Sequence, residues 1–505
     1  MENLRQLAVI DIGSNSVRLV IYDLFGSHFT PVYNEKILAG LGRDLRTTGR
    51  LSVKGKALCR AALARFSKII AARGLSAPLI GATAAMRQAE DAPNFVKEIK
   101  LETGLDISPI SGTEEARLSA LGLLSSNDRR KGLAADLGGA SLEIMYVSPE
   151  LRHKPSAFKG VSLPLGPFDA IGGNLSQLTS KDYHSRISDI DSYLENIPNE
   201  MSPEDQLFLI GGAWRNLASV HQHHVNYPLR TLQGYPIGSK AAGELGNWAY
   251  NEGLDTLLKW PGMRRARAET LPYAGLLLER LLLRFKPRSI IGSMAGLREG
   301  LVWDNLSQTV KSRDPLIDGC RDFARGFVQA EHFGTPLFKF LSPLLPYFYC
   351  GFGDGNDARL LQAACHLAGL GKNLHPDYRA ELVFEDVLYA PVAGLTHAER
   401  VFLSLSLFRT YTAKRQPPGP EIIETLLNDA QRDIAASIGE AIRTAIVLTG
   451  RTPSLLSDFE LLIDDGVLEL KANAALEDML TPQLIYRFEK LAKRLGLKSK
   501  LAKRD

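Results

Sequence analysis

Two stretches of this sequence carry the same chemistry-bearing residues in the same order. Asp-Ile-Gly-Ser-Asn-Ser-Val-Arg-Leu-Val begins at Asp11, and Asp-Leu-Gly-Gly-Ala-Ser-Leu-Glu-Ile-Met begins at Asp136, 125 residues later. Apolar runs flank both, which predicts a strand, a tight turn and a second strand. Each unit places a carboxylate at a strand end beside backbone N–H groups that can cradle an anion or phosphate. Either aspartate alone could instead cap its own turn, but the duplication favours a shared function.

Charged residues between the two units extend this expectation. Glu114 and Glu115 stand at the start of a predicted helix, where a carboxylate can orient a water molecule, although the helix dipole alone also favours acidic residues there. Arg18 and Arg87 offer guanidinium forks that suit bidentate contacts with phosphate. An ordinary ion pair with the acidic residues at 90–91 is the alternative for Arg87.

Strands alternate with helices in the surrounding pattern up to about residue 300. Apolar runs predict strands at 79–82, 106–111, 207–212 and 289–293, and periodic stretches predict helices at 56–72, 94–103, 114–124 and 274–284. From about 315 to 450 the chain reads as almost all helix. Residues 459–472 place Asp-Gly between two apolar alternations, which is typical of a tight hairpin, and a basic amphipathic helix follows at 484–495. The sequence therefore predicts an α/β half, a helical region and a small α+β domain.

Composition narrows the class of protein. The chain has 505 residues, 45% hydrophobic and 23% charged, which indicates a globular protein of several domains. Its 60 basic and 56 acidic residues leave a net charge of +4, too even to indicate a specific nucleic-acid partner. The four cysteines are too far apart for a metal or redox motif and suit a reducing compartment. The most apolar stretch, 337–352, contains Lys339 and two prolines and is too short to span a bilayer, so we expect a cytoplasmic protein.

Five motifs in order carry a family resemblance. DIGSNSVRLVI (11–21), GATAAMRQAED (81–91), ISGTEEARL (110–118), DLGGASLEI (136–144) and GLREG (296–300) together resemble the exopolyphosphatase/guanosine pentaphosphate phosphohydrolase family, within the superfamily of acetate and sugar kinases, actin and chaperone ATPases. The resemblance covers residues 7–300. It implies an α/β fold of duplicated actin-like (ribonuclease H-like) ATPase-type domains at 1–127 and 128–305. An α-helical, degenerate His-Asp-like domain at 306–452 and a small α+β domain at 453–505 would follow.

The resemblance also implies roles for the site residues. Glu115 would orient or deprotonate the attacking water, with Glu114 as the alternative, and Asp136, Glu143 and Asp11 would hold Mg²⁺. Mg²⁺ suits such a site because it takes one or two carboxylates together with waters and substrate phosphates. Phosphate binding falls to the two loops and two arginines: Gly13, Ser14, Asn15, Ser16, Arg18, Arg87, Gly138, Gly139, Ala140 and Ser141. Arg298, in the GLREG motif, is expected only to pin a helix.

The sequence departs from the family pattern at two places. The second loop usually reads D-I-G-G-G-S-T-E, whereas here Ala140 replaces a glycine and Leu142 replaces the threonine. After LFLIGG the chain has Ala213-Trp214 where the family tends to have a small residue and threonine. The carboxylates are unchanged, so these departures bear on substrate preference more than on catalysis.

Positive charge is concentrated between residues 43 and 73, where nine basic residues accompany one acidic residue and give a local excess of +8. A solvated helix face is the plain interpretation. A long polyanion would also benefit from such a surface, through counterion release and steering. We therefore expect a polyphosphate track that includes Arg43, Arg46, Arg50 and Lys54, with a second basic cluster, Arg264, Arg265 and Arg267, in the same role.

Histidines give only weak metal signals. His366 is followed by Leu367, so the helical region lacks a His-Asp pair at this position. His221, His223 and His224 form the cluster HQHH, for which a polar loop is the favoured interpretation over a metal site. No G-x-x-x-x-G-K-[ST] phosphate loop occurs in the sequence.

These expectations lead to one favoured function and three alternatives. The favoured function is Mg²⁺-dependent, processive hydrolysis of the terminal phosphate of inorganic polyphosphate, and the first alternative is the same reaction on guanosine pentaphosphate (pppGpp) in the stringent response. An ATP-dependent kinase of the superfamily is disfavoured by the GTEEA glutamate and by the lack of an evident adenosine pocket. A catalytically silent regulator is disfavoured because all candidate carboxylates are present. Relatives imply a homodimer, and no membrane partner is expected.

Overall fold

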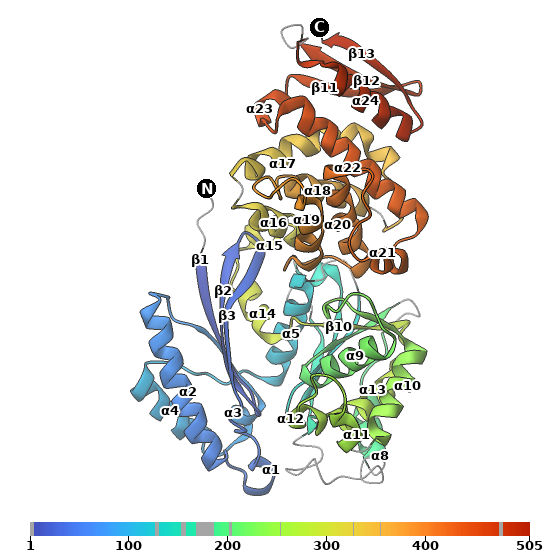
Figure 1. The fold of residues 1–505 in the computed structure, drawn as a ribbon. Coiled ribbons are helices and arrows are strands. Elements are labelled where there is room, and N and C mark those ends of the chain that lie inside the picture. Colours follow the sequence, from blue (N-terminus) through green and yellow to red (C-terminus); the bar gives the residue numbers. More distant parts are fainter. Residues whose placement is uncertain are drawn as a thin grey trace. The chain divides into compact units, whose positions relative to one another are not determined.

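The computed structural model describes residues 5–126, 131–152, 158–167, 186–200, 205–252, 254–326, 328–353, 355–473 and 478–504. The chain divides into two compact units, Met1–Arg313 and Asp314–Asp505 (Figure 1). The predicted boundary at 127/128 lies outside the described residues, and the division into four domains stays a prediction. No described helix has both the length and the apolar character needed to cross a membrane.

The first unit alternates strands with helices. Its described strands are β1 (Arg5–Ile12), β2 (Val17–Phe25), β3 (His28–Ile37), β4 (Leu79–Ala82), β5 (Gly132–Leu137), β6 (Leu142–Val147), β7 (Gly160–Leu163), β8 (Gln206–Ile210), β9 (Pro236–Gly238) and β10 (Ser289–Ser293). Its described helices are α1 (Leu45–Thr48), α2 (Val53–Ala72), α3 (Ala84–Gln88), α4 (Ala92–Thr103), α5 (Gly112–Ser126), η1 (Pro149–Arg152), α8 (Ile187–Glu195), α9 (Gly212–His224), α10 (Ser239–Asn251), α11 (Leu254–Leu258), α12 (Arg265–Ala268), α13 (Leu271–Phe285), α14 (Leu297–Asp304) and α15 (Gln308–Lys311).

The two sheets of this unit repeat one topology. The first has the order β3-β2-β1-β4, and the second has the order β7-β6-β5-β8-β10-β9. In each, a hairpin (β1–β2 or β5–β6) is antiparallel, and its first strand then pairs in parallel with a later strand, β4 or β8. The predicted duplication is therefore confirmed at the level of the fold.

Alternating side chains of each central strand face two different layers. On one face of the first sheet, Ala8, Ile10 and Ile12 belong to a core shared with α2 and α4, and on the other face Leu7 and Val9 share a core with Val302 of α14. The second sheet follows the same rule, since α9, α10 and α13 contribute to the core on one face and α5 to the core on the other. This period of two is what a sheet buried on both faces requires.

Helices α5 and α14 lie side by side and pack backbone to backbone (Figure 1). A Cβ atom at Gly122 would overlap the carbonyl oxygen of Gly296, and one at Gly300 would overlap the carbonyl oxygen of Leu118. Only glycine allows helices to approach this closely. The helix that precedes the second sheet in the chain, α5, thus covers that sheet, and α14, which follows it, returns to cover the first.

The second unit is helical with a small sheet at its end. Its described elements are α16 (Pro315–Ala324), α17 (Val328–Leu341), η4 (Ser342–Tyr347), α18 (Asn356–Leu367), α19 (Arg379–Tyr389), α20 (His397–Tyr411), α21 (Pro420–Leu426), α22 (Asp429–Thr449), α23 (Pro453–Leu456), β11 (Phe459–Asp464), β12 (Val467–Asn473), α24 (Pro482–Arg494) and β13 (Lys498–Arg504). The Asp-Gly hairpin is confirmed, because Asp465 and Gly466 both have positive φ between β11 and β12. Strand β13 then pairs in parallel with β12.

Candidate active site

The two Asp-x-Gly hairpins have the same register. Asp11 lies opposite Arg18 across β1–β2, and Asp136 lies opposite Glu143 across β5–β6. Both turns are closed by the same hydrogen bond: Gly13 N–H donates to the Ser16 carbonyl at 2.9 Å, and Gly138 N–H to the Ser141 carbonyl at 3.0 Å. The residues expected to cradle phosphate occupy these turns: Gly13, Ser14, Asn15 and Ser16 in the first, and Gly138, Gly139, Ala140 and Ser141 in the second.

Neighbouring chain segments fix both loops. The carbonyls of Ser14 and Asn15 accept hydrogen bonds from Gly42 N–H at 2.8 Å and Gly40 N–H at 3.0 Å. Behind the second loop, Gly211 has a φ of +123°, and a Cβ there would stand 2.6 Å from the Leu137 carbonyl oxygen. Since only glycine fits at that turn, the start of α9 can lie directly against the second loop.

Four carboxyl groups are brought to one electrostatic cluster by four elements. Asp11 comes from β1, Glu115 from α5, Asp136 from β5 and Glu143 from β6. Glu115 and Glu143 are 7% and 1% exposed. Ser119 donates to Asp136 Oδ2 at 2.6 Å, which orients that carboxylate.

Burial of like charges raises the pKa of all four carboxyl groups in the cluster. Burial raises the pKa of Glu115 to about 7, against the opposing pull of Arg87 and with a further upward push from Asp136. Burial, followed by the charges of Glu115 and Asp136, raises the pKa of Glu143 well above its ordinary value. Burial also raises the pKa of Asp11 and of Asp136. Such mutual repulsion is relieved when a cation binds.

The structure separates Glu115 from Glu114, which the sequence leaves as alternatives. Arg87 Nη1 lies 3.2 Å from Glu115 Oε2 and also donates to the Ile110 carbonyl at 2.7 Å. Glu114 instead accepts two hydrogen bonds from Arg117, whose guanidinium also binds Asp304. The geometry places Glu115 in the carboxyl cluster and ties Glu114 to an ion pair outside it.

A row of cations leads away from the carboxyl cluster across the first sheet. Arg18 of β2 lies opposite Asp11 on one side and opposite Lys36 of β3 on the other. Burial, followed by the charge of Arg18, lowers the pKa of Lys36 to about 8, with smaller contributions from Arg215 and Arg267. Arg267 of the second predicted basic cluster is therefore within electrostatic reach of this row.

Two further arginines enter the site. Arg298, expected only to pin a helix, has its Nε 3.8 Å from Asp11 Oδ2 and therefore lies beside a member of the carboxyl cluster. Arg215, which no sequence motif singled out, lies in the first turn of α9, and its Nη1 donates to the Ser293 carbonyl at 3.4 Å. Burial, followed by the charge of Arg298, lowers the pKa of Arg215 to about 10, and Asp136 opposes that shift. Its place just after a strand end, where α/β sheets bind ligands, is the signal that could have identified it.

Two residues that depart from the family pattern, Leu142 and Trp214, are buried in the core of the second sheet. Leu142 is fully buried and faces the core of the second sheet. Trp214 is 1% exposed, and its Nε1 donates to the Ala274 carbonyl at 3.1 Å, which anchors the first turn of α9 to α13. Arg215 is therefore held on a helix start that its neighbour locks in place.

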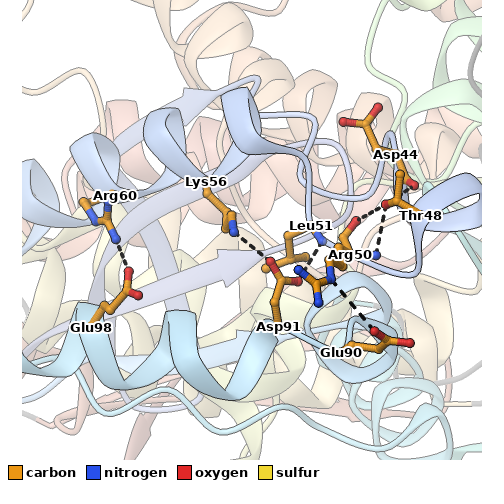
Figure 2. A network of polar contacts seen from close by, with 9 residues as sticks. All are labelled: Asp44, Thr48, Arg50, Leu51, Lys56, Arg60, Glu90, Asp91 and Glu98. Carbon is orange, nitrogen blue, oxygen red and sulfur yellow. Dashed lines mark hydrogen bonds and ion pairs between the residues drawn. The ribbon is translucent and has the colours of Figure 1, made fainter.

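Part of the positive charge of residues 43–73 is paired with acidic residues from elsewhere in the chain. In Figure 2, Lys56 pairs with Asp91 at 2.7 Å, Arg60 pairs with Glu98, and Arg50 lies 3.9 Å from Glu90. These pairs reduce the local excess of +8 without removing it, so the polyphosphate track stays a prediction. Of the residues named for the track, Arg43, Arg46, Arg50 and Lys54 are exposed along 43–54, and Arg264, Arg265 and Arg267 are exposed at α12.

Of the histidines singled out in the sequence, His221 and His223 have hydrogen-bond partners within the protein, and His366 has none. His221 Nδ1 lies 2.7 Å from the Tyr235 hydroxyl, and His223 Nδ1 lies 2.8 Å from the Ser219 carbonyl. His366 is buried, both ring nitrogens lack a hydrogen-bond partner, and burial lowers its pKa to about 4. Within the described parts of the chain, no group of three or more His, Cys, Asp or Glu side chains is arranged to hold a metal ion.

Comparison with known proteins agrees with this fold. The chain resembles crystal structures of an Aquifex aeolicus Ppx/GppA family member (TM-score 0.52, 21% identity, 60% of this chain and 100% of that chain). It also resembles an exopolyphosphatase from Cytophaga hutchinsonii (TM-score 0.53, 22% identity, 60% and 99%). These identities support the fold alone.

Sequence relatives cover different parts of the chain. Exopolyphosphatase 1 of Mycobacterium tuberculosis is 31% identical over 164 residues, which are 32% of this chain and 46% of that protein. The chain thus spans about half the length of such curated relatives. Retrograde regulation protein 2 of Saccharomyces cerevisiae is 24% identical over 438 residues, 79% of this chain and 71% of that protein.

Two family models match the chain along most of its length. The model of the exopolyphosphatase C-terminal domain matches residues 347–502. The model of the Ppx/GppA phosphatase family matches residues 20–309, which is more than half of the chain and includes most of the residues of the carboxyl cluster. The chain therefore belongs to the Ppx/GppA phosphatase family.

Proposed function

We propose that this protein is an exopolyphosphatase, which removes the terminal phosphate of inorganic polyphosphate by hydrolysis. The observation that carries the proposal is the buried carboxyl cluster around Glu115, continued by the cations Arg18 and Lys36 and approached by Arg267. A linear polyanion matches this arrangement, because its terminal phosphate can sit at the carboxyl cluster while the preceding phosphates contact the cations.

In the proposed reaction, Glu115 holds the attacking water and takes its proton as the water oxygen bonds to the terminal phosphorus. The bridging P–O bond breaks, orthophosphate leaves, and the shortened chain keeps the bridging oxygen. A carboxyl group with a pKa near 7 suits this role because it accepts a proton at neutral pH and returns it readily. Arg87, 3.2 Å from Glu115, orients that carboxylate and is placed to contact the phosphate as well.

The proposal includes Mg²⁺ as the cofactor. Asp136 and Glu143 fit the ion, since they are neighbouring oxygen donors whose burial together is unfavourable without a cation. Asp11 remains a further candidate from the sequence, but no described group of three such side chains is arranged around one ion, so the proposal rests on Asp136 and Glu143. When bound, Mg²⁺ would neutralise charge on the phosphate oxygens. We also propose that the protein forms a homodimer and acts in the cytoplasm.

The phosphate-release assay tests this function. Purified protein is incubated with long-chain polyphosphate and, separately, with guanosine pentaphosphate, each with Mg²⁺ or with a chelator. We expect orthophosphate from polyphosphate only when Mg²⁺ is present. Faster release from guanosine pentaphosphate would assign the stringent-response substrate instead, and release in the chelator would contradict the role of the metal.

Arg215 is expected to contribute to phosphate binding in this site. Replacing Arg215 with methionine should raise KM for polyphosphate about 10- to 100-fold, because a hydrogen bond to a charged group contributes about 1.5–3 kcal/mol. The melting temperature should hold or rise, since partial burial and the charge of Arg298 both disfavour the charged guanidinium. Arg215→Lys, which keeps the charge but loses the planar fork, should fall between the two. A wild-type KM in Arg215→Met would exclude the contact, and a lower melting temperature would indicate a structural role.

A further inference from the structure

The second unit contains a cavity that the proposed function does not use. It measures about 440 Å³ and is bounded by α20, the segment 413–417, α21, α22 and α24. All the proposed catalytic residues belong to the first unit, whereas every residue that lines this cavity lies between 405 and 494. Its size is within the range of small-molecule sites, about 300–1,000 Å³.

The polar part of its wall includes three arginines and Lys490 together with the carboxylates of Glu424, Asp433 and Glu440, and one arginine has no carboxylate partner among the described residues. Arg409 donates through Nη1 alone, to the carbonyls of Arg415 at 2.9 Å and Ala413 at 3.4 Å. Among the described residues no carboxylate pairs with Arg409, which leaves its Nε and Nη2 donors without a protein acceptor. The carbonyl contacts hold the guanidinium in place while half of its fork stays available.

A second guanidinium, that of Arg494, reinforces the positive charge. Its Nε donates to Ser437 Oγ at 2.9 Å, and its Nη2 lies 3.2 Å from the Asp433 carbonyl oxygen. Burial, followed by the charge of Arg494, lowers the pKa of Arg409, so the two cations repel each other. The carboxylate of Asp433, 3.4 Å from Arg494, is 85% exposed and offsets little of this repulsion.

The buried carboxylate of the cavity wall, that of Glu440, forms ion pairs with other cations. Glu440 has 5% of its side chain exposed and lies 2.9 Å from Lys490 and 3.8 Å from Arg487. Arg432, also in the wall, pairs with the exposed Asp429. The cavity therefore holds two neighbouring guanidiniums that repel each other, and of the carboxylates that line it only the exposed Asp433 is paired with one of them among the described residues. An anion bound between them would relieve this repulsion.

The rest of the wall is apolar and stiff. Leu405, Ile423 and Ala436 come from helices, and Pro417 and Pro420 restrict the backbone of the segment that closes the cavity. A free inorganic anion would gain no binding energy from contact with these apolar side chains. An organic phosphate does, because its ring or carbon skeleton can cover the apolar wall while its phosphate contacts Arg409 and Arg494.

We propose that this cavity binds a small organic phosphate, with Arg409 and Arg494 on the phosphate group and Leu405, Ile423 and Pro417 against the organic part. Two guanidinium forks suit the oxygens of one phosphate monoester. The site extends the protein beyond hydrolysis, since it would place a phosphorylated metabolite in the unit that lacks the proposed catalytic residues.

Calorimetric titration of the full chain tests the proposal. The probes are adenosine and guanosine 5′-monophosphates and, separately, inorganic pyrophosphate. We expect at least one nucleotide to bind the wild type and to bind Arg409→Met at least 10-fold more weakly. Lys414→Met is the matched control, because Lys414 is an exposed cation of the same segment that does not line the cavity. Its affinity for the nucleotide should equal that of the wild type.

Two further variants separate this site from the proposed active site and from a folding defect. Arg87→Met, altered in the first unit, should keep the nucleotide affinity of the wild type. Arg494→Lys, which keeps the charge, should weaken binding with an unchanged melting temperature. Absence of nucleotide binding to the wild type, or equal binding to Arg409→Met, would overturn the proposal. Tighter binding of pyrophosphate than of both nucleotides would overturn the organic part of the assignment.

Discussion

Replacing Glu115 with glutamine is expected to lower the turnover of polyphosphate about 10²- to 10⁴-fold, the usual contribution of a positioned general base. Glutamine keeps the size and the contact with Arg87 but cannot take a proton from water. The side chain is 7% exposed and interacts electrostatically with Asp136 and Glu143. No other described carboxylate on α5 has this position, so none can replace it. Steady-state phosphate release gives kcat and KM, and KM should change by less than kcat.

The pH dependence provides a second readout of the same group. A base with a pKa of about 7 gives a rate that rises with pH up to that value, and this rise should disappear in Glu115→Gln. The folded pKa exceeds the ordinary 4.5, so the carboxyl group costs stability as pH rises from about 4.5 to about 7. At pH 8 the glutamine variant should therefore melt at or above the wild-type temperature.

Glu114→Gln is the matched control for this prediction. Glu114 is one residue away on the same helix but bound to Arg117, so its replacement should leave turnover within about twofold and slightly lower stability, as loss of a partly exposed ion pair usually does. If Glu114→Gln loses activity while Glu115→Gln keeps it, the two roles have been assigned to the wrong residues.

Replacing Gly300 with alanine is expected to destabilise the first unit by about 3 kcal/mol or more, at the upper end of overpacking effects. The added Cβ would overlap the Leu118 carbonyl oxygen, a backbone atom that cannot rotate away as a side chain can. Helices α5 and α14 would have to separate, and both carry site residues, Glu115 on the first and Arg298 on the second. Thermal unfolding should show a large fall in melting temperature together with loss of hydrolysis.

Gly243→Ala controls for the effect of alanine itself. Gly243 lies inside α10, and a Cβ there would reach its nearest neighbour, Leu282 Cδ1, at 4.0 Å. Since alanine favours helix by about 0.5–1 kcal/mol over glycine, this variant should be as stable as the wild type or more so. A Gly300→Ala protein with wild-type stability would mean that the two helices are not packed as described.

The elements that the sequence predicts best are those with strong local signals. The hairpins at Asp11 and Asp136 have continuous apolar strands and small-residue turns, and both form as expected. Strand β3 was not expected, because its ten residues mix charged and polar side chains with Pro31 along a sheet edge. The strand predicted at 106–111 reduces to one bridge between Ala82 and Pro109, since proline has no N–H to continue the ladder.

The site residues also differ in whether a local sequence signal predicts them. Asp11, Asp136, Glu143 and Glu115 belong to local motifs that the sequence shows. The distinction between Glu114 and Glu115 depends on a guanidinium that reaches Asp304, 187 residues away from Arg117. Lys36, Arg215 and Arg298 join the site through sheet register and the return of α14, which bring distant segments together. Arg215 follows a strand end and Arg298 lies in GLREG, but neither position shows by itself that its side chain reaches the carboxyl cluster.

The return of α14 to the first sheet has a consequence for synthesis on the ribosome. Val302, which covers Leu7 and Val9, is translated about 290 residues after them. At roughly 5–20 residues per second this interval lasts tens of seconds. Throughout it Val302 cannot cover this apolar face of the nascent sheet, and transiently exposed apolar surface of this kind favours aggregation of a growing chain.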